Sequence, residues 1–251
     1  MKFSICIESV FPEIPVYDRL ELVRELRPDA VEFWDIHEYD TKKLGALLAK
    51  YSYPVAVCSL NNNWDVRMND SFARVKRNIE ETIETGKDVG CSTFICMSGD
   101  VMNRTDSQKM IITENFKRMA EICEKKDVTL LLEPLNSLYD HKGYYLDNAY
   151  DGFEIVKTVD SPKVKLLFDC YHMQVMQGNL INCIRDNIGY IGHVHSAGVP
   201  GRKELHLGET NYPLIIDTLE ELGYTGYFGL EYFPSYDSKQ SLRDVFRYVR
   251  K

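Results

Sequence analysis

The sequence predicts an α/β fold, a (β/α)8 TIM barrel built from one domain over residues 1–251. Three observations lead to it. Short apolar runs alternate with helix-like stretches along the whole chain, eight such pairs can be counted, and a length of 251 residues suits a barrel that needs about 250. Because strict alternation of strands and helices implies a parallel sheet, eight units favour a sheet closed on itself.

Each expected strand is a short, nearly continuous apolar run bounded by polar or turn residues. Such runs are typical of parallel strands that are covered by helices, because both faces of the sheet are then buried. The eight runs occupy residues 2–8, 30–34, 54–60, 93–97, 129–135, 164–169, 190–197 and 227–232.

The stretches between these runs have helical periodicity. In residues 72–90, apolar side chains return every three or four positions and mark one buried stripe. The helix expected over 148–160 stops before Ser161-Pro162, and the one over 212–223 ends at Gly223, a residue common after helix ends. Further helices are expected over 110–127 and 241–251.

An open, doubly wound sheet is the alternative architecture. It would normally place a glycine-rich turn after the first strand, and here that turn reads ESVFPEIP over residues 8–15, without a glycine. The closed barrel is therefore the better prediction.

Composition limits the partners. The formal net charge of −8 argues against nucleic acid, which needs a concentrated basic face, and no apolar run approaches the roughly 18 residues of a membrane span. Glu8 interrupts the first apolar run before a signal peptide could form. Seven cysteines without a CxxC pair are expected to be reduced core residues of a cytoplasmic protein.

Two similar segments place a glutamate at the end of an apolar run: TLLLEPLN at 129–136 and YFGLEYFP at 227–234. Glutamate is rarely buried unless it is paired or holds a metal. The last four expected strands end at Glu133, Asp169, His195 and Glu231, which follow one another at 36, 26 and 36 residues. Because the carboxyl ends of barrel strands open onto one face, these four side chains are expected to meet there.

Three carboxylates and one imidazole suit a single divalent ion such as Mn²⁺, Mg²⁺ or Co²⁺, and Zn²⁺ is also compatible with them. Any one of these residues taken alone is explained as well by a structural hydrogen bond or an arginine partner. All four in register favour the metal, because three carboxylates this close would otherwise be forced to take up protons.

Several motifs together resemble the hydroxypyruvate isomerase-like group of sugar isomerases and epimerases, within the xylose-isomerase-like barrel superfamily. They are LLLEPLN, DHKGYYL, KLLFDCYHMQ, GHVHSAGVPGR, GETNYP and GLEYFP, densest over residues 128–235. The resemblance implies that Glu133, Asp169, His195 and Glu231 bind the metal and that both glutamates are catalytic acid/base groups. It also implies that His172 and Arg202 bind the substrate.

The chain departs from the family pattern at two positions. Many hydroxypyruvate isomerases have glutamine where His195 stands. The histidine of this chain therefore favours the ketose epimerases. Those epimerases often carry an acid six residues after the first metal glutamate, where this chain has Tyr139. The substrate, and the choice between isomerase and epimerase, therefore stay open.

Other residues carry weaker signals. Trp34, together with Phe11 and Trp64, is expected to wall a sugar-binding pocket, although ordinary packing explains these rings equally well. Glu8 and Glu32 are considered as further contacts to sugar hydroxyls. The polar segment 197–211, which carries Arg202, is expected to be a lid or a subunit contact, so a homo-oligomer is left open.

The predicted function is a metal-dependent isomerase or epimerase of a small sugar or keto acid. It would transfer a proton through an enediolate, with Glu133 and Glu231 as its acid/base groups. A lyase or dehydratase on a related sugar is the first alternative. An endonuclease is disfavoured by the charge of −8, and a binding protein without catalysis would not need two such glutamates.

Overall fold

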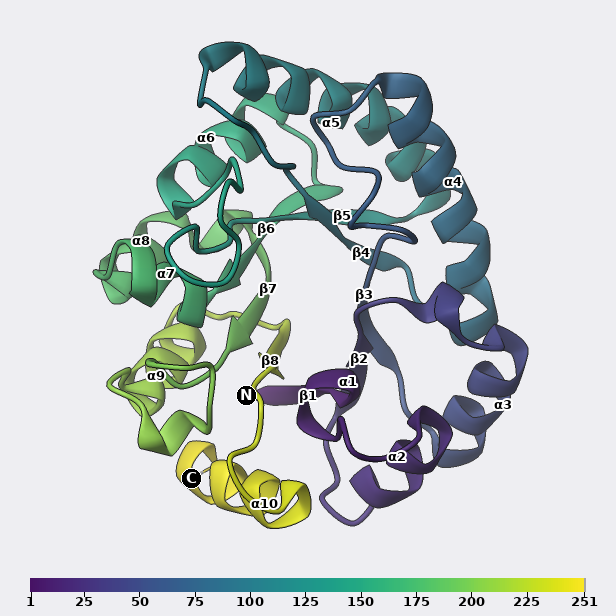
Figure 1. The fold of residues 1–251 in the computed structure, drawn as a ribbon, viewed down its shortest axis with the longest axis vertical. Coiled ribbons are helices and arrows are strands. Elements are labelled where there is room, and N and C mark those ends of the chain that lie inside the picture. The colour runs from purple at the N-terminus through teal and green to yellow at the C-terminus, as the bar shows by residue number, and fades with distance from the viewer. Residues whose placement is uncertain (251) are drawn as a thin grey trace.

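The computed structural model describes residues 1–250 and forms a closed barrel of eight parallel strands ringed by helices (Figure 1). Each strand pairs with its neighbours in chain order, and β1 pairs with β8 to complete the ring. This confirms the barrel prediction and excludes the open sheet. The strands are β1 Lys2–Cys6, β2 Ala30–Phe33, β3 Val55–Ser59, β4 Thr93–Met97, β5 Thr129–Glu133, β6 Val164–Asp169, β7 Ile191–Ser196 and β8 Tyr227–Leu230.

The helices cover the outside of the ring, and two details differ from expectation. Residues 7–10 leave the first strand and form α1, and a short helix, α7, starts directly at the end of β6. The final helix was expected over 241–251 and is found as α10, while Lys251 lies outside the described residues. The α-helices are α1 Ile7–Val10, α2 Val16–Val23, α3 Thr41–Tyr51, α4 Phe72–Val89, α5 Asp106–Lys126, α6 Ala149–Val159, α7 Cys170–Met176, α8 Leu180–Asn187, α9 Tyr212–Glu221 and α10 Ser238–Val249.

The inside of the barrel is built from every second residue of each strand, because side chains of a strand alternate between its two faces. We call the interior side chains two positions before the predicted ligands, together with those level with them on the other strands, the lower layer. This layer is apolar on one half, where Val57, Ile95, Leu131 and Leu167 form a separate cluster. On the other half it is polar and contains Ser4, Glu32 and His193. The predicted ligands stand two residues after members of this layer, so they form the layer above it.

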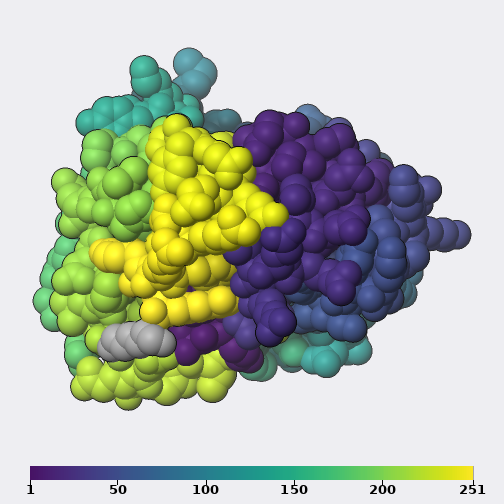
Figure 2. Space-filling model, turned by 90° about the horizontal axis from the view of Figure 1, so that it is seen from below, coloured from purple at the N-terminus to yellow at the C-terminus, as the bar shows by residue number. Residues whose placement is uncertain are grey.

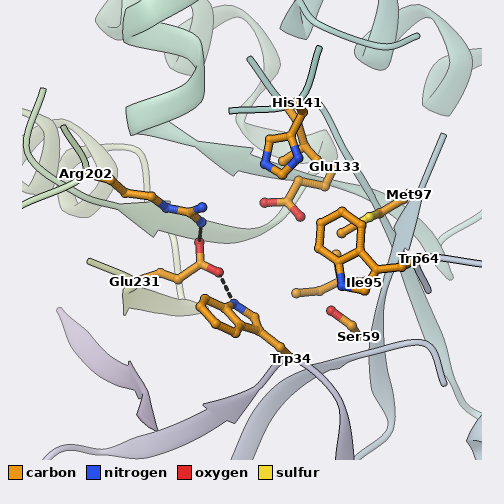
Figure 3. A pocket seen from close by; sticks show the side chains of 10 residues that line it. Trp34, Ser59, Trp64, Ile95, Met97, Glu133, His141, Arg202 and Glu231 are labelled. Atoms are coloured by element: carbon orange, nitrogen blue, oxygen red, sulfur yellow. Dashed lines mark hydrogen bonds and ion pairs between the residues drawn. The ribbon is translucent and has the colours of Figure 1, made fainter. Parts of the chain in front are cut away.

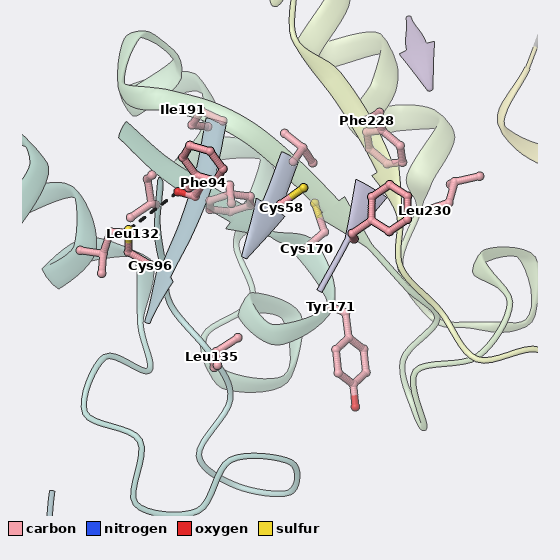
Figure 4. Close-up of a cluster of buried hydrophobic side chains, with 14 of the residues drawn as sticks. Cys58, Phe94, Cys96, Leu132, Leu135, Cys170, Tyr171, Ile191, Phe228 and Leu230 are labelled. Carbon is pink, nitrogen blue, oxygen red and sulfur yellow. Dashed lines mark hydrogen bonds between the residues drawn. The ribbon is translucent and has the colours of Figure 1, made fainter. Parts of the chain in front are cut away.

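The main apolar core lies between the barrel and its helices. Alternate strand residues such as Phe94, Leu132 and Phe228 face outward and are fully buried there (Figure 4). The last helix, α10, closes the structure against the N-terminal segment, as the adjacent yellow and purple surfaces of Figure 2 show. Lys239 and Arg243 of α10 both form ion pairs with Glu25 at that contact.

All seven cysteines are free and buried, as expected for reduced core residues. Within residues 1–250, no helix combines the length and the apolar character needed to cross a membrane. The cytoplasmic location and the homo-oligomer stay predictions.

The close contact between α4 and β4 generates a stability prediction. A Cβ added at Gly86 would lie 2.5 Å from the ring of Phe94 and 2.8 Å from the carbonyl oxygen of Cys91. We expect Gly86→Ala to lower the free energy of unfolding by about 1–3 kcal/mol through overpacking, measured by urea denaturation.

Gly189→Ala is the matched control, because no atom lies within 4 Å of its added Cβ and its φ is not positive. It should change stability by less than about 0.5 kcal/mol. Equal effects of the two substitutions would show that the α4–β4 contact does not require glycine.

Candidate metal and substrate site

The four predicted ligands meet at the carboxyl end of the barrel. Glu133 and Asp169 are the last residues of β5 and β6, His195 is the penultimate residue of β7, and Glu231 directly follows β8. One donor atom from each lies within 4.8 Å of the others. All four side chains are buried, with 5%, 1%, 2% and 4% exposure respectively. The four side chains therefore lie together in space, as their spacing in the sequence predicted.

Asp169 is held in place by the helix that follows it. Its Oδ1 accepts hydrogen bonds from the backbone N–H groups of Tyr171, at 2.7 Å, and His172, at 3.1 Å, and so caps α7. Its second oxygen, Oδ2, is 3.7 Å from Nε2 of His172. Burial and the nearby Glu231 raise the pKa of Asp169 to about 7, so this carboxylate lacks sufficient positive charge around it.

Glu231 has the strongest partners of the group. Arg202 donates from Nη2 to Oε2 at 2.5 Å, and the indole N–H of Trp34 donates to Oε1 (Figure 3). Burial opposes ionisation of Glu231, but Arg202 and His195 outweigh it and hold the pKa of this carboxylate well below its usual range. By contrast, burial and the charge of Glu231 raise the pKa of Glu133.

Arg202 reaches the site from the loop after β7, as the sequence suggested. Its guanidinium lies 5.7 Å from the ring centres of both Tyr171 and Phe233, and its Nε is buried without a hydrogen-bond partner. Arg202 is thus a half-buried cation whose buried Nε–H is still free to donate a hydrogen bond.

His195 carries the observation that tests whether a metal fits. Its Nδ1 faces the carboxylates, 3.3 Å from Glu231 Oε2 and 3.6 Å from Glu133 Oε1, yet this buried nitrogen has no hydrogen-bond partner. A buried polar atom without a partner is costly. An unpartnered imidazole nitrogen beside three carboxylate groups is a donor set that suits a divalent cation, so the residues present fit a metal ion.

His172 is a second buried imidazole with an unsatisfied nitrogen. Its Nδ1 accepts from the backbone N–H of Asn136 at 3.1 Å and lies 2.7 Å from the side-chain amide nitrogen of the same residue. The proton of the neutral ring must therefore sit on Nε2, which has no hydrogen-bond partner. Burial and the charge of Arg202 keep the pKa of His172 well below its usual value, so the ring offers a neutral N–H donor.

A cavity of about 110 Å³ opens beside these residues. Glu133 and Glu231 reach it from different sides (Figure 3). Trp34 lines it, as predicted, whereas His172 and Asp169 lie outside its wall. Its lining consists of Trp34, Ser59, Trp64, Ile95, Met97, Glu133, Leu135, His141, Arg202 and Glu231.

The outer wall is an aromatic pair. The rings of Trp64 and His141 stack 5.8 Å apart at 10°, and the exposed fraction of Trp64 is 59%. His141 was missed by sequence reasoning, because it lies in an irregular loop without periodicity. Ser59 and Met97 were also missed, although each stands two residues after an inward-facing strand residue, Val57 or Ile95.

Three weaker expectations fail. Phe11 is fully buried and does not line the cavity. Glu8 accepts hydrogen bonds from the backbone N–H of Trp34 and the hydroxyl of Tyr39. Its carboxylate therefore connects α1 to the segment after β2, and Glu8 does not line the cavity. Glu32 lies below the site, bonded to two histidines.

Comparison with known proteins gives a consistent result. A family model described as xylose isomerase-like TIM barrel matches residues 17–251. The 2-oxo-tetronate isomerase of Cupriavidus necator is 35% identical over 62% of this chain, and the match spans 60% of that relative, less than two thirds of its length. The hydroxypyruvate isomerase of Escherichia coli is 26% identical over 97% of both chains.

A solved structure extends the likeness to three dimensions. The crystal structure of AP endonuclease, family 2, from Brucella melitensis superposes with a TM-score of 0.92 and 27% identity, covering 98% of each chain. The family model confirms the family resemblance predicted from the sequence motifs, and this structure and the two isomerases agree with it.

The raised pKa of Asp169 generates a prediction for the metal-free protein. With a pKa of about 7 when folded, Asp169 keeps a proton that the unfolded chain, near pKa 3.9, has already lost. Between about pH 4 and pH 7 the folded state binds more protons, so its stability falls as pH rises. Asp169→Asn cannot ionise and keeps Oδ1 as the helix cap. We expect it to melt at a higher temperature than the parent protein at about pH 8, with the difference shrinking towards pH 4.

Calorimetry in EDTA across this pH range measures the effect. A variant that melts below the parent protein at about pH 8 would contradict the electrostatic account of this site.

Proposed function

The chain belongs to the xylose isomerase-like TIM barrel family, and we propose that it is a metal-dependent isomerase or epimerase of a small sugar or keto acid. The observation that carries the proposal is the convergence of Glu133, Asp169, His195 and Glu231 beside a cavity that the two glutamates approach from different sides. The relatives named 2-oxo-tetronate isomerase and hydroxypyruvate isomerase support a short hydroxy-keto acid as substrate.

Glu133, Asp169, His195 and Glu231 would hold the ion. A divalent cation there supplies Lewis-acid stabilisation of negative charge that develops on the oxygens of a hydroxycarbonyl substrate. Arg202 is the cation that balances Glu231, at 2.5 Å. Arg202 still has an unpartnered Nε, and it would use this donor capacity to bind a substrate oxygen or carboxylate.

Glu133 and Glu231 would do the proton transfer. One of them removes the proton from the carbon beside the carbonyl, which gives an enediolate, and a glutamate then returns it. Return to the neighbouring carbon interconverts aldose and ketose, whereas return to the opposite face of the same carbon inverts its configuration. Trp34 orients Glu231 through Oε1. The resemblance assigns a substrate hydroxyl to His172, and its unpartnered Nε2–H supports that role although the residue lies outside the cavity wall.

The cavity favours a short substrate. Its volume of about 110 Å³ is below the roughly 300–1,000 Å³ of pockets that enclose drug-sized ligands. Ile95, Met97 and Leu135 give it an apolar wall, and the stacked Trp64 and His141 close its outer side. A chain of three or four carbons fits this enclosure better than a hexose does.

Two alternatives share the fold. A lyase or dehydratase would begin with the same proton removal and then expel a leaving group from the next carbon, so its products differ in composition from the substrate. The likeness to an endonuclease raises DNA as a substrate. The formal charge of −8 and the narrow cavity disfavour it, since a bound DNA backbone needs many basic contacts.

The first prediction of this proposal concerns the metal. We expect the purified protein to contain about one divalent ion per chain, EDTA to remove its isomerase activity, and Mn²⁺ or Co²⁺ to restore it. His195→Ala should weaken metal binding sharply, because the site loses its only nitrogen ligand. Elemental analysis and activity on C3–C6 ketoses and keto acids measure both effects, and full activity without metal would refute metal dependence.

A second prediction concerns proton transfer. Product formed in D₂O should carry deuterium on the carbon that receives the returned proton, because an enediolate exchanges with solvent-derived protons. Metal-loaded Glu133→Gln and Glu231→Gln keep a ligating oxygen without the base. In an epimerase with one base on each face, each change should abolish turnover, while one variant still exchanges substrate deuterium.

For an isomerase with a single base, only one of the two substitutions should remove exchange altogether. Mass spectrometry of the product and elemental analysis of each variant provide the readouts. Full activity in both metal-loaded variants would rule out these glutamates as the acid/base pair.

A further inference from the structure

We propose that Glu32, which lies outside the cavity, is a positioning residue that determines which nitrogen of His195 faces the metal. The inference rests on the proposed metal site. Glu32 belongs to β2, and its exposed fraction is 1%, although no arginine or lysine pairs with it among the described ion pairs. A carboxylate buried this deeply inside a barrel requires an explanation.

The carboxylate of Glu32 is shared between two imidazoles. Its Oε2 lies 3.0 Å from Nε2 of His195, and its Oε1 lies 2.8 Å from Nε2 of His193 and also accepts the hydroxyl proton of Ser4. An ionised carboxylate can only accept hydrogen bonds, so both imidazoles must carry a proton on Nε2. A histidine must give up its second proton to bind a metal, and in that neutral form of His195 the lone pair is on Nδ1, the atom that faces Glu133 and Glu231.

Strand β8 has a glycine, Gly229, where it passes the contact between Glu32 and His195. A Cβ on Gly229 of β8 would lie 2.7 Å from Glu32 Oε1 and 2.7 Å from Cδ2 of His195. Gly229 is the register partner of both His195 and Ser4, so it occupies the point where β8 passes the network. The space that glycine leaves is filled by the Glu32–His195 contact.

Glu32, His193 and His195 could also be considered as a second metal site, since their donor atoms are close together. The contacts favour a hydrogen-bonded network instead. Both oxygens of Glu32 and both Nε2 atoms are already engaged with each other, whereas Nδ1 of His195 is the atom left without a partner. The nitrogen of His195 that is free to bind an ion therefore faces Glu133 and Glu231, on the side of the ring away from Glu32.

Loss of Glu32 should weaken metal binding without touching a ligand. Without the acceptor below it, the ring can carry its proton on Nδ1, where it would hydrogen-bond to Glu231 or Glu133 and leave no lone pair for the ion. Removing such a partner of a ligating histidine typically costs 10–100-fold in metal affinity.

Glu32→Met tests this, because methionine has a similar length and provides no strong acceptor. Ser4→Ala is the matched control, since Ser4 bonds to Oε1 of the same carboxylate and leaves the Oε2–His195 contact in place. Calorimetric titration of the EDTA-treated proteins with Mn²⁺ should show affinity about 10–100-fold lower for Glu32→Met and changed by less than about threefold for Ser4→Ala.

Melting temperatures measured alongside separate positioning from packing. A folded Glu32→Met variant that binds Mn²⁺ like the parent protein overturns the inference, even if it melts earlier. Absence of Mn²⁺ binding by the parent protein would instead overturn the proposed function, so the two failures are distinct.

A measurement on the parent protein keeps the inference testable if Glu32→Met does not fold. In protein labelled with ¹⁵N-histidine and loaded with diamagnetic Zn²⁺, nitrogen chemical shifts distinguish the metal-bound atom from the protonated one. We expect Nε2 of His195 to keep its proton and Nδ1 to bind the ion. Zinc bound through Nε2, or a proton on Nδ1, would show that Glu32 does not set the ring in this way.

Discussion

The structure depends on one electrostatic constraint: three buried carboxylates and one imidazole share the carboxyl end of the barrel. Like charges at this separation in a low-dielectric site drive protonation unless a cation balances them. Arg202 and His195 balance Glu231, but the pKa of Asp169 rises to about 7 and that of Glu133 is raised as well. A divalent ion among the four side chains would relieve this strain and would give the unpartnered nitrogen of His195 its ligand.

The barrel brings these groups together through the alternation of its strands. Each candidate ligand stands two residues after a residue of the lower interior layer: Glu133 follows Leu131 on β5, and Asp169 follows Leu167 on β6. That layer is apolar on the side of the cavity, where Ile95 also lines the wall, and polar beside His195, where Glu32 and His193 lie. The apolar half of the layer fills the interior of the barrel. In the polar half, Glu32 holds the imidazole of His195 by a hydrogen bond.

The fold and the clustering of the four candidate ligands could be predicted from local pattern. Eight apolar runs marked the strands, and a polar residue at the end of each of the last four marked Glu133, Asp169, His195 and Glu231. The contacts of Glu32 could not be predicted, because they join residues 161 and 163 positions away across the barrel. His141 lies in an irregular loop, and α1 and α7 are too short to show periodicity.

Anomalous diffraction from crystals grown with Mn²⁺ tests the central claim most directly. The account predicts one peak among Glu133, Asp169, His195 and Glu231, at about 2.0–2.3 Å from their donor atoms, with Nδ1 as the imidazole ligand. Crystals that contain Mn²⁺ but show no peak at these residues, or a peak elsewhere while Nδ1 of His195 stays without a partner, would contradict it.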